Sequence, residues 1–261
     1  MPVGIEIRPS AAAGNHILRA RRVVLWLLAA AAATQLASAA QAPPAPAGPQ
    51  GRFVVVLDAA HGGDDTGGRL ANGAPEKSFT LAFSVRLRSL LAARGIQVLN
   101  LRESDTGIDP NHRAELANHA NAQACLSLHA SESGSGTHLF ISSLPSPARA
   151  GEKNAPQPAR FAAWKTAQAA WVPRSLALAG VLNSALQHAG MTVTLGRAAM
   201  PGVDSMACPA VAVEIAPERN AAQQTTAELD NADYQARVAA ALAAALLEWR
   251  AEASRTEVHQ P

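Results

Sequence analysis

The sequence predicts a single α/β domain with a central, mostly parallel or mixed sheet that helices cover on both faces. Short apolar runs rich in β-branched residues recur along the chain, as expected of strands that are buried on both faces. Segments with helical periodicity alternate with these runs. This alternation implies parallel strands joined by right-handed crossovers, so the carboxyl ends of neighbouring strands share one edge of the sheet.

The first half of the chain supplies most of the predicted elements. The run RFVVVLD (52–58) is short, apolar and β-branched, which indicates a buried strand. The helix expected at 78–94 has its apolar side chains on one face and ends at Gly95. Patterns of the same kinds predict strands at 96–101, 124–128 and 137–142 and a helix at 111–121.

The second half begins with a loop-like stretch, 145–173, that contains five prolines. A helix is expected at 174–189, then the buried strand AVAVEI (210–215), then an Ala-rich helix from about 230 to 250. The predicted boundaries are a signal peptide at 1–39, a Pro/Ala-rich linker at 40–51, the domain at 52–250 and a flexible tail at 251–261.

Length and composition fit one domain with flanking segments. The chain has 261 residues, of which 48% are hydrophobic, and this is enough for one substantial core. The formal net charge is +2, but four arginines and one glutamate in residues 1–39 contribute +3, which leaves −1 for the rest. A domain without excess basic charge is not expected to bind nucleic acid.

The amino-terminal segment has the features of an export signal. A cluster of arginines at 19–22 precedes the apolar run 23–33, and the small residues Ala-Ser-Ala at 37–39 supply a cleavage site. We therefore expect a protein of the periplasm or cell envelope, exported by the Sec route or, through its arginine pair, by the twin-arginine route. An uncleaved membrane anchor is the alternative, because small and apolar residues continue almost to Ala40.

Three candidate metal ligands lie where such a sheet would bring them together. His61 directly follows the first strand, His129 directly follows the third, and Glu76 lies in the loop that enters the first helix. Two histidines and one glutamate form a recognised catalytic zinc set that leaves a fourth position open for water. The sequence therefore predicts one zinc ion per chain at this edge of the sheet.

Glu214 completes the predicted site. It lies near the end of AVAVEI among apolar neighbours, where a carboxylate costs several kcal/mol to bury unless it is paired or functional. If this strand is parallel to the others, Glu214 reaches the metal edge, where it can act as general base and then as general acid. A structural ion pair with Arg197 or Arg219 is the alternative.

The two cysteines, Cys125 and Cys208, both lie in or beside predicted buried strands. We expect two thiols in the core, although an oxidising compartment would also permit a disulfide between them.

Four further polar residues have predicted roles. Arg113 is expected to pair with a carboxylate that fixes its helix, while Arg102 or Arg197 is a candidate for contact with an acidic peptide substrate. His138, in the fourth predicted strand, is a candidate for lining the substrate groove.

Six stretches resemble the zinc-dependent N-acetylmuramoyl-L-alanine amidases of the AmiC/CwlV type, the Amidase_3 family, in the family's order and spacing over about residues 52–250. The resemblance implies that His61, Glu76 and His129 bind zinc and that Glu214 is the catalytic glutamate. The stretches are VVLDAAHGGDDTGG (55–68), PEKSF (75–79), LRESD (101–105), HRAELANHANA (112–122), LSLHAS (126–131) and PAVAVEIAPERN (209–220).

The sequence departs from the family pattern at three places. It has Ala59-Ala60 where Pro-Gly usually precedes the first zinc histidine, and Ser131 where Asn is usual. After the catalytic glutamate it reads Ile-Ala-Pro (215–217) where the family tends to show Gly-Phe or Ala-Phe. None of these changes removes a ligand, so they bear on the shape of the substrate groove more than on metal binding.

The resemblance implies hydrolysis of the amide bond between N-acetylmuramic acid and the L-alanine of the stem peptide, with peptidoglycan as the substrate. It leaves room for a protein activator and leaves the oligomeric state open. Two alternatives are a zinc peptidase or deacylase with another exported substrate, and a non-catalytic wall-binding protein of the same fold. Some relatives carry an inhibitory helix, so Glu152 is a candidate for occupying the open zinc position, but we expect 145–173 to be an exposed proline-rich excursion.

Overall fold

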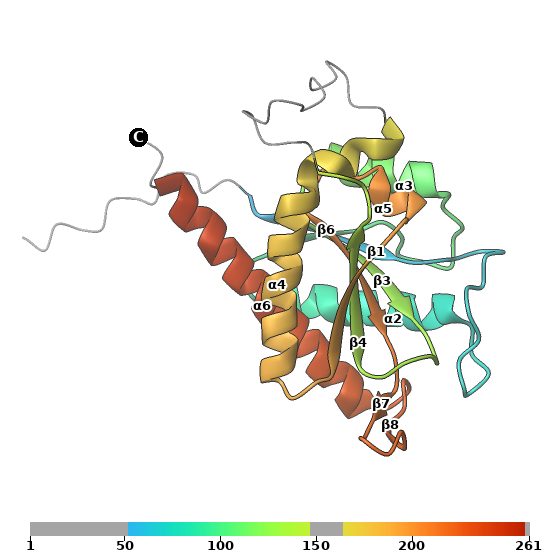
Figure 1. Cartoon of the computed structure of the whole chain (residues 1–261). Helices are drawn as coiled ribbons and strands as arrows, with labels where there is room; N and C mark the ends of the chain where they lie inside the picture. Colours follow the sequence, from blue (N-terminus) through green and yellow to red (C-terminus); the bar gives the residue numbers. More distant parts are fainter. Residues whose placement is uncertain (1–51, 147–163, 259–261) are drawn as a thin grey trace, which may run out of the picture. The chain divides into compact units, whose positions relative to one another are not determined.

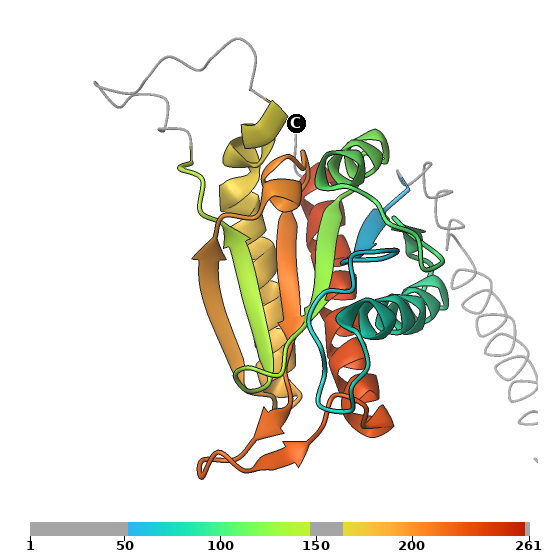
Figure 2. The ribbon, with the colours of Figure 1, turned by 90° about the vertical axis from the view of Figure 1, so that its right-hand side faces the viewer.

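Six strands form one mixed sheet in the computed structural model, which describes residues 52–146 and 164–258. The strand order is β2-β1-β3-β6-β4-β5 (Figure 1, Figure 2). The strands are β1 (Val54–Ala59), β2 (Gln97–Asn100), β3 (Ala124–Ala130), β4 (Thr137–Ser142), β5 (Val193–Ala198) and β6 (Ala210–Ile215).

Strands β2, β1, β3 and β6 are parallel to one another. Strand β4 is antiparallel to β6, and β5 is parallel to β4. The predicted fold class, one α/β domain with a mostly parallel mixed sheet, is therefore confirmed. Strand β5 is not among the predicted elements. Its side chains are only half-buried or exposed at the edge of the sheet, so it lacks the continuous apolar run of a central strand.

Helices cover both faces of the sheet, as predicted. Helix α6 continues past its predicted end at Arg250, so residues 251–258 are helical where a flexible tail was expected. The Ala, Glu and Arg residues of this stretch are good helix formers. The helices are α2 (Glu76–Ala92), α3 (Pro110–His119), α4 (Val172–His188), α5 (Pro201–Asp204), α6 (Ala232–Val258) and the 3-10 helix η2 (Trp164–Trp171), and a small separate sheet pairs β7 (Glu218–Arg219) with β8 (Thr225–Ala227).

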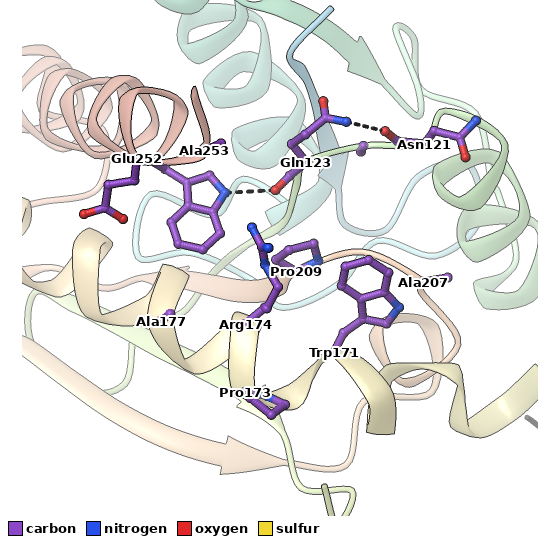
Figure 3. A pocket seen from close by; sticks show the side chains of 12 residues that line it. Asn121, Gln123, Trp171, Pro173, Arg174, Ala177, Ala207, Pro209, Glu252 and Ala253 are labelled. Atoms are coloured by element: carbon purple, nitrogen blue, oxygen red, sulfur yellow. Dashed lines mark hydrogen bonds between the residues drawn. The ribbon is translucent and has the colours of Figure 1, made fainter. Parts of the chain in front are cut away.

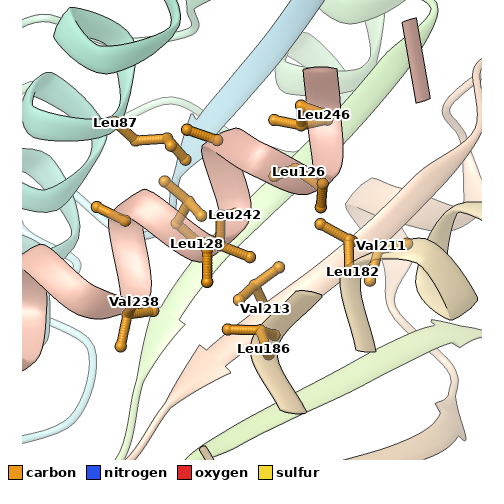
Figure 4. Packing of buried hydrophobic residues seen from close by; sticks show 14 of the residues in the cluster. Leu87, Leu126, Leu128, Leu182, Leu186, Val211, Val213, Val238, Leu242 and Leu246 are labelled. Atoms are coloured by element: carbon orange, nitrogen blue, oxygen red, sulfur yellow. The ribbon is translucent and has the colours of Figure 1, made fainter. Parts of the chain in front are cut away.

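The larger core lies between the sheet and helices α2, α4 and α6 (Figure 4). Alternate side chains of the central strands point into it, among them Leu126 on β3 and Val213 on β6, both fully buried. Leu182 of α4 and Leu242 of α6 pack in the same cluster. Each fully buried Leu or Val side chain stabilises the fold by about 1.5–3 kcal/mol.

The opposite face of the same strands is apolar in its amino half and polar in its carboxyl half. Its amino half is apolar and packs under α3 and α5, with Val56, Cys125 and Ala210 in this second core. Every second residue of a strand lies on this face, because strand residues alternate between the two faces of a sheet. In the carboxyl half of these strands the residues on this face are polar. These polar residues are Asp58 on β1, Ser127 and His129 on β3, and Glu214 on β6.

Cys125 and Cys208 form a disulfide, with Cα atoms 6.3 Å apart, so the expectation of two free thiols is wrong. The bond links β3 to the loop that precedes β6. The two residues are 83 positions apart and come together only because β3 pairs with β6. At this point the Cys125 N–H donates to the Pro209 carbonyl at 2.8 Å.

Three predicted features lie outside the described residues: the signal peptide at 1–39, the linker at 40–51, and Glu152 in the proline-rich stretch. Within residues 52–146 and 164–258 we find no helix with the length and hydrophobicity needed to cross a bilayer.

Reducing the Cys125–Cys208 disulfide is expected to lower the free energy of unfolding by about 2–4 kcal/mol, because the bond restricts a long loop of the unfolded chain. Denaturant unfolding with and without a thiol reductant measures the change. The double variant Cys125→Ala, Cys208→Ala is the control and should not respond to reductant. Equal stability of the oxidised and reduced chain would contradict the assigned disulfide.

Candidate metal centre

The three predicted ligands converge at the carboxyl ends of β1 and β3. The Glu76 carboxylate bridges the two imidazoles, with Oε2 at 3.1 Å from His61 Nε2 and Oε1 at 3.1 Å from His129 Nδ1. One potential ligand atom from each residue lies within 4.8 Å of the other two. An ion bound at about 2.0–2.2 Å from each atom needs ligands that are this close together. The sequence prediction of which residues meet here is therefore matched by the geometry, and the set could hold one metal ion.

Glu76 is the first residue of α2 and is buried, with 6% of its surface exposed. Its carboxylate accepts hydrogen bonds from the backbone N–H groups of Gly68 at 2.9 Å and Ala130 at 3.0 Å. Burial raises the pKa of this carboxyl, but the hydrogen bonds from His129 and the two backbone groups, together with nearby His61, outweigh burial and lower the pKa to about 2. Glu76 is therefore ionised and fixed in position, as a metal ligand must be.

His61 lies in the turn after β1 with a φ of 64°, in the left-handed region. Its Nδ1 is 2.9 Å from both carboxylate oxygens of Asp65. This hydrogen bond also lowers the pKa of the Asp65 carboxyl. Because Asp65 engages Nδ1, Nε2 is the nitrogen that faces Glu76, and a carboxylate on the far ring nitrogen is a common way of orienting a metal-binding histidine.

Arg113 of α3 pairs with Asp58 at the end of β1, which confirms that it binds a carboxylate. It also donates to the carbonyl of His61 at 2.7 Å. The second oxygen of Asp58 accepts from Ser127 Oγ at 3.1 Å, and this hydroxyl lies 3.5 Å from His129 Nε2. The buried Arg113–Asp58 pair is therefore linked to the His61 backbone directly and to the His129 side chain through the Ser127 hydroxyl.

Arg102 is buried, with 3% of its surface exposed, so the prediction that it meets an acidic substrate is wrong. Its guanidinium donates to the carbonyls of Ala59 at 2.8 Å, Ala60 at 3.1 Å and Lys77 at 2.7 Å. Arg197, the other candidate, donates to carbonyls at the end of β4 and just beyond it. The sequence does not distinguish these roles, because it does not show how deeply a guanidinium is buried.

Glu214 lies in register with His129 on β3 and with His138 on β4. Directly opposite residues on neighbouring strands point to the same face, so Glu214 stands between the two imidazoles. Its Oε1 is 2.8 Å from His138 Nδ1, and its side chain is 31% exposed. The alternative ion pairs are not formed: Arg197 is engaged as described above, and Arg219 donates to Gly134, Glu132 and Thr225.

Two hollows open beside His129. One, of about 370 Å³, extends from His61 and Asp58 to Met200 and Pro201 at the start of α5. The other, of about 340 Å³, is lined by polar side chains, among them Glu132 and Glu214. Together they leave room for a substrate on either side of the ligand cluster.

A larger groove of about 750 Å³ lies at the amino ends of β3 and β6, away from this cluster (Figure 3). It is lined by Trp171, Arg174 and Gln123, and the Arg174 guanidinium lies 5.3 Å from the centre of the Trp249 ring. Its lining, which consists of described residues only, offers one carboxylate, Glu252, and no second side chain suited to a metal. We therefore place the chemistry at the smaller hollows.

Comparison with known proteins gives the same family throughout. The Amidase_3 model, described as N-acetylmuramoyl-L-alanine amidase, matches residues 55–248. The N-acetylmuramoyl-L-alanine amidase AmiA of Escherichia coli (strain K12) is 42% identical over 80 residues, which cover 31% of this chain and 28% of that protein. The match to this relative thus spans less than a third of its length. The amidase Rv3717 of Mycobacterium tuberculosis is 27% identical over 231 residues, which cover 79% of this chain and 89% of that protein.

A solved structure supports the same relationship. The catalytic domain of CwlV, an N-acetylmuramoyl-L-alanine amidase from Bacillus (Paenibacillus) polymyxa var. colistinus, superimposes with a TM-score of 0.56 at 26% identity. The superposition covers 76% of this chain and 97% of that domain.

The substitution Gly67→Ala is expected to weaken metal binding at this cluster about 10- to 100-fold. Gly67 has a φ of 64°, and a Cβ there would lie 2.5 Å from His61 Cδ2 and 2.7 Å from Glu76 Oε2, which would push the two ligands apart. Gly73→Ala is the matched control, because its φ is 82° but no atom lies within 4 Å of the added carbon. Zinc titration against a competing chelator measures both affinities, and equal values for the two variants would refute the proposed contact.

Proposed function

The chain belongs to the Amidase_3 family of N-acetylmuramoyl-L-alanine amidases, and from this membership we propose that it hydrolyses the amide bond between N-acetylmuramic acid and the L-alanine of the stem peptide in peptidoglycan. The observation that carries the proposal is the ligand cluster of His61, Glu76 and His129 with Glu214 in register beside it. A hydrolase of this kind needs a metal-binding set next to a carboxylate that solvent can reach, and this edge of the sheet provides both.

The donor set fits zinc. Two imidazoles and one carboxylate, without thiolates, are typical of catalytic zinc sites, which keep a further position open. His61 would bind through Nε2, His129 through Nδ1 and Glu76 through its carboxylate. A zinc ion held by these residues would act as a Lewis acid toward the scissile carbonyl and would lower the pKa of a bound water to about 7.

Glu214 supplies the proton transfers. Its carboxylate takes a proton from the attacking water as the new C–O bond forms at the carbonyl carbon. It then returns this proton to the nitrogen of L-alanine as the C–N bond breaks, so the products are a free lactyl carboxyl group and a free amine. The Glu214 side chain is 31% exposed and lies in register with His129, which leaves it open to solvent beside the ligand cluster.

The two hollows beside His129 suit a substrate that extends in both directions from the scissile bond. We assign one hollow to the muramic acid side and the other to the stem peptide. A protein activator remains a prediction from the family resemblance.

Digestion of purified sacculi with the protein and zinc is expected to release intact stem peptides from the glycan strands, as measured by mass spectrometry. Cleavage within the stem peptide would instead indicate a peptidase or deacylase. Binding to sacculi without any products would indicate a wall-binding protein. Either result would overturn the proposed reaction.

Substitutions separate metal binding from proton transfer in the same assay. Glu214→Gln is expected to keep its zinc and to lose turnover by about 10²–10⁴-fold, because an amide cannot act as general base. His129→Ala is expected to lose both zinc and turnover. Glu115→Gln, on the exposed surface of α3, is the control and should behave like wild type. Full activity in Glu214→Gln would exclude the proposed mechanism.

We further propose that the protein is exported to the periplasm or cell envelope. The amino-terminal pattern supports this location, and so does the Cys125–Cys208 disulfide, because disulfides persist in oxidising compartments. Cell fractionation is expected to find a shortened chain outside the cytoplasm, and amino-terminal sequencing is expected to place the cut after Ala39. A full-length chain in the cytoplasm would contradict the proposal.

A further inference from the structure

We propose that His138 is a positioning residue that holds the Glu214 carboxylate for proton transfer, an inference that rests on the proposed amidase function. None of the residues assigned so far fixes Glu214, although the reaction requires its carboxylate to face the attacking water. His138 lies on the neighbouring strand and contacts Glu214 directly.

The backbone fixes which residues meet. Glu214 is the Cα partner of His138 in the antiparallel pair of β4 and β6. Opposite residues in such a pair have Cβ atoms about 4.5–5.5 Å apart on one face of the sheet. The 2.8 Å contact between His138 Nδ1 and Glu214 Oε1 therefore follows from strand register and does not require a mobile loop to close.

The imidazole of His138 is held on its far edge. Gly134 has a φ of 85°, and a Cβ at this position would lie 2.2 Å from His138 Cε1 and 2.6 Å from His138 Nε2. Only glycine allows the backbone to approach the ring so closely. The ring of Phe140 lies edge-to-face with the imidazole, with the two ring centres 6.4 Å apart. Only 13% of the His138 side chain is exposed. With its ring packed in this way, His138 presents Nδ1 to Glu214.

The contact has a consequence for the chemistry of Glu214. A proton on Nδ1 of His138 is donated to Oε1, which restrains the rotation of the carboxylate and leaves Oε2 to exchange a proton with water and amine. Holding a reacting group in its productive geometry lowers the barrier without altering how tightly substrate binds. Loss of His138 should therefore reduce kcat and leave KM almost unchanged.

Two substitutions distinguish positioning from packing. His138→Leu removes the donor but fills similar space, and it is expected to lower kcat on sacculi about 10- to 100-fold with zinc content and KM unchanged. His138→Asn keeps an amide N–H donor close to the place of Nδ1 and should recover most of this loss. His119→Leu, at the exposed end of α3, is the matched control and should retain wild-type kcat.

The outcomes separate this role from the proposed function. Wild-type kcat in His138→Leu, in a protein that Glu214→Gln inactivates, would overturn the role of His138 alone. Full turnover in Glu214→Gln would exclude Glu214 as the general base, and this role with it, whereas the proposed amide hydrolysis is overturned only if intact stem peptides are not released from sacculi. If His138→Leu does not fold, NMR of labelled histidines in the unaltered protein decides the question. A hydrogen-bonded Nδ1 proton on His138 that disappears in Glu214→Ala supports the role, and its absence from the unaltered protein refutes it.

Discussion

Two buried guanidinium groups hold the turn that carries His61, the first of the candidate metal ligands. Arg102 and Arg113 donate to the carbonyls of residues 59–61, where β1 ends. Among the described residues, Asp58 is the one carboxylate paired with Arg113. Burial, followed by the charge of Arg113, lowers the pKa of Arg102. Buried charges are tolerated only when hydrogen bonds compensate their lost hydration, so these carbonyls and arginines depend on each other, and the left-handed backbone of His61 depends on both.

The pairing of the strands positions the other residues of the site. Parallel pairing of β1 with β3 places His61 and His129 at one edge, and α2 begins where its first side chain, Glu76, reaches both. Parallel pairing of β3 with β6 then sets Glu214 directly beside His129. Strand β4 runs antiparallel to β6 and places His138 on the other side of Glu214. His129, Glu214, His138 and Glu76 are therefore placed by backbone hydrogen bonds of the sheet or by the start of a helix, which are more rigid than loops, whereas His61 depends on the turn that the two arginines hold.

This origin explains which parts of the site could be predicted from the sequence. His61 and His129 could be grouped because residues at the carboxyl ends of neighbouring parallel strands share an edge, and Glu76 because the loop after His61 can bring it back to that edge. The sequence contains no comparable rule for the partner of His138, since that contact requires knowing that β4 lies next to β6 and runs the other way. The disulfide escaped prediction for the same reason, because Cys208 meets β3 only through the pairing of β3 with β6.

At each departure from the family pattern the backbone makes a contact that does not depend on which side chain is present. Ala59 and Ala60 serve the site through carbonyls that accept from arginines, and any residue supplies a carbonyl. Ser131 donates its N–H to the Ile215 carbonyl at 3.0 Å. Beyond Glu214, the Ala216 carbonyl accepts from the Tyr234 hydroxyl at 2.7 Å. Because these contacts survive a change of side chain, the chain can differ at all three places and still hold His61, Glu76, His129 and Glu214 together.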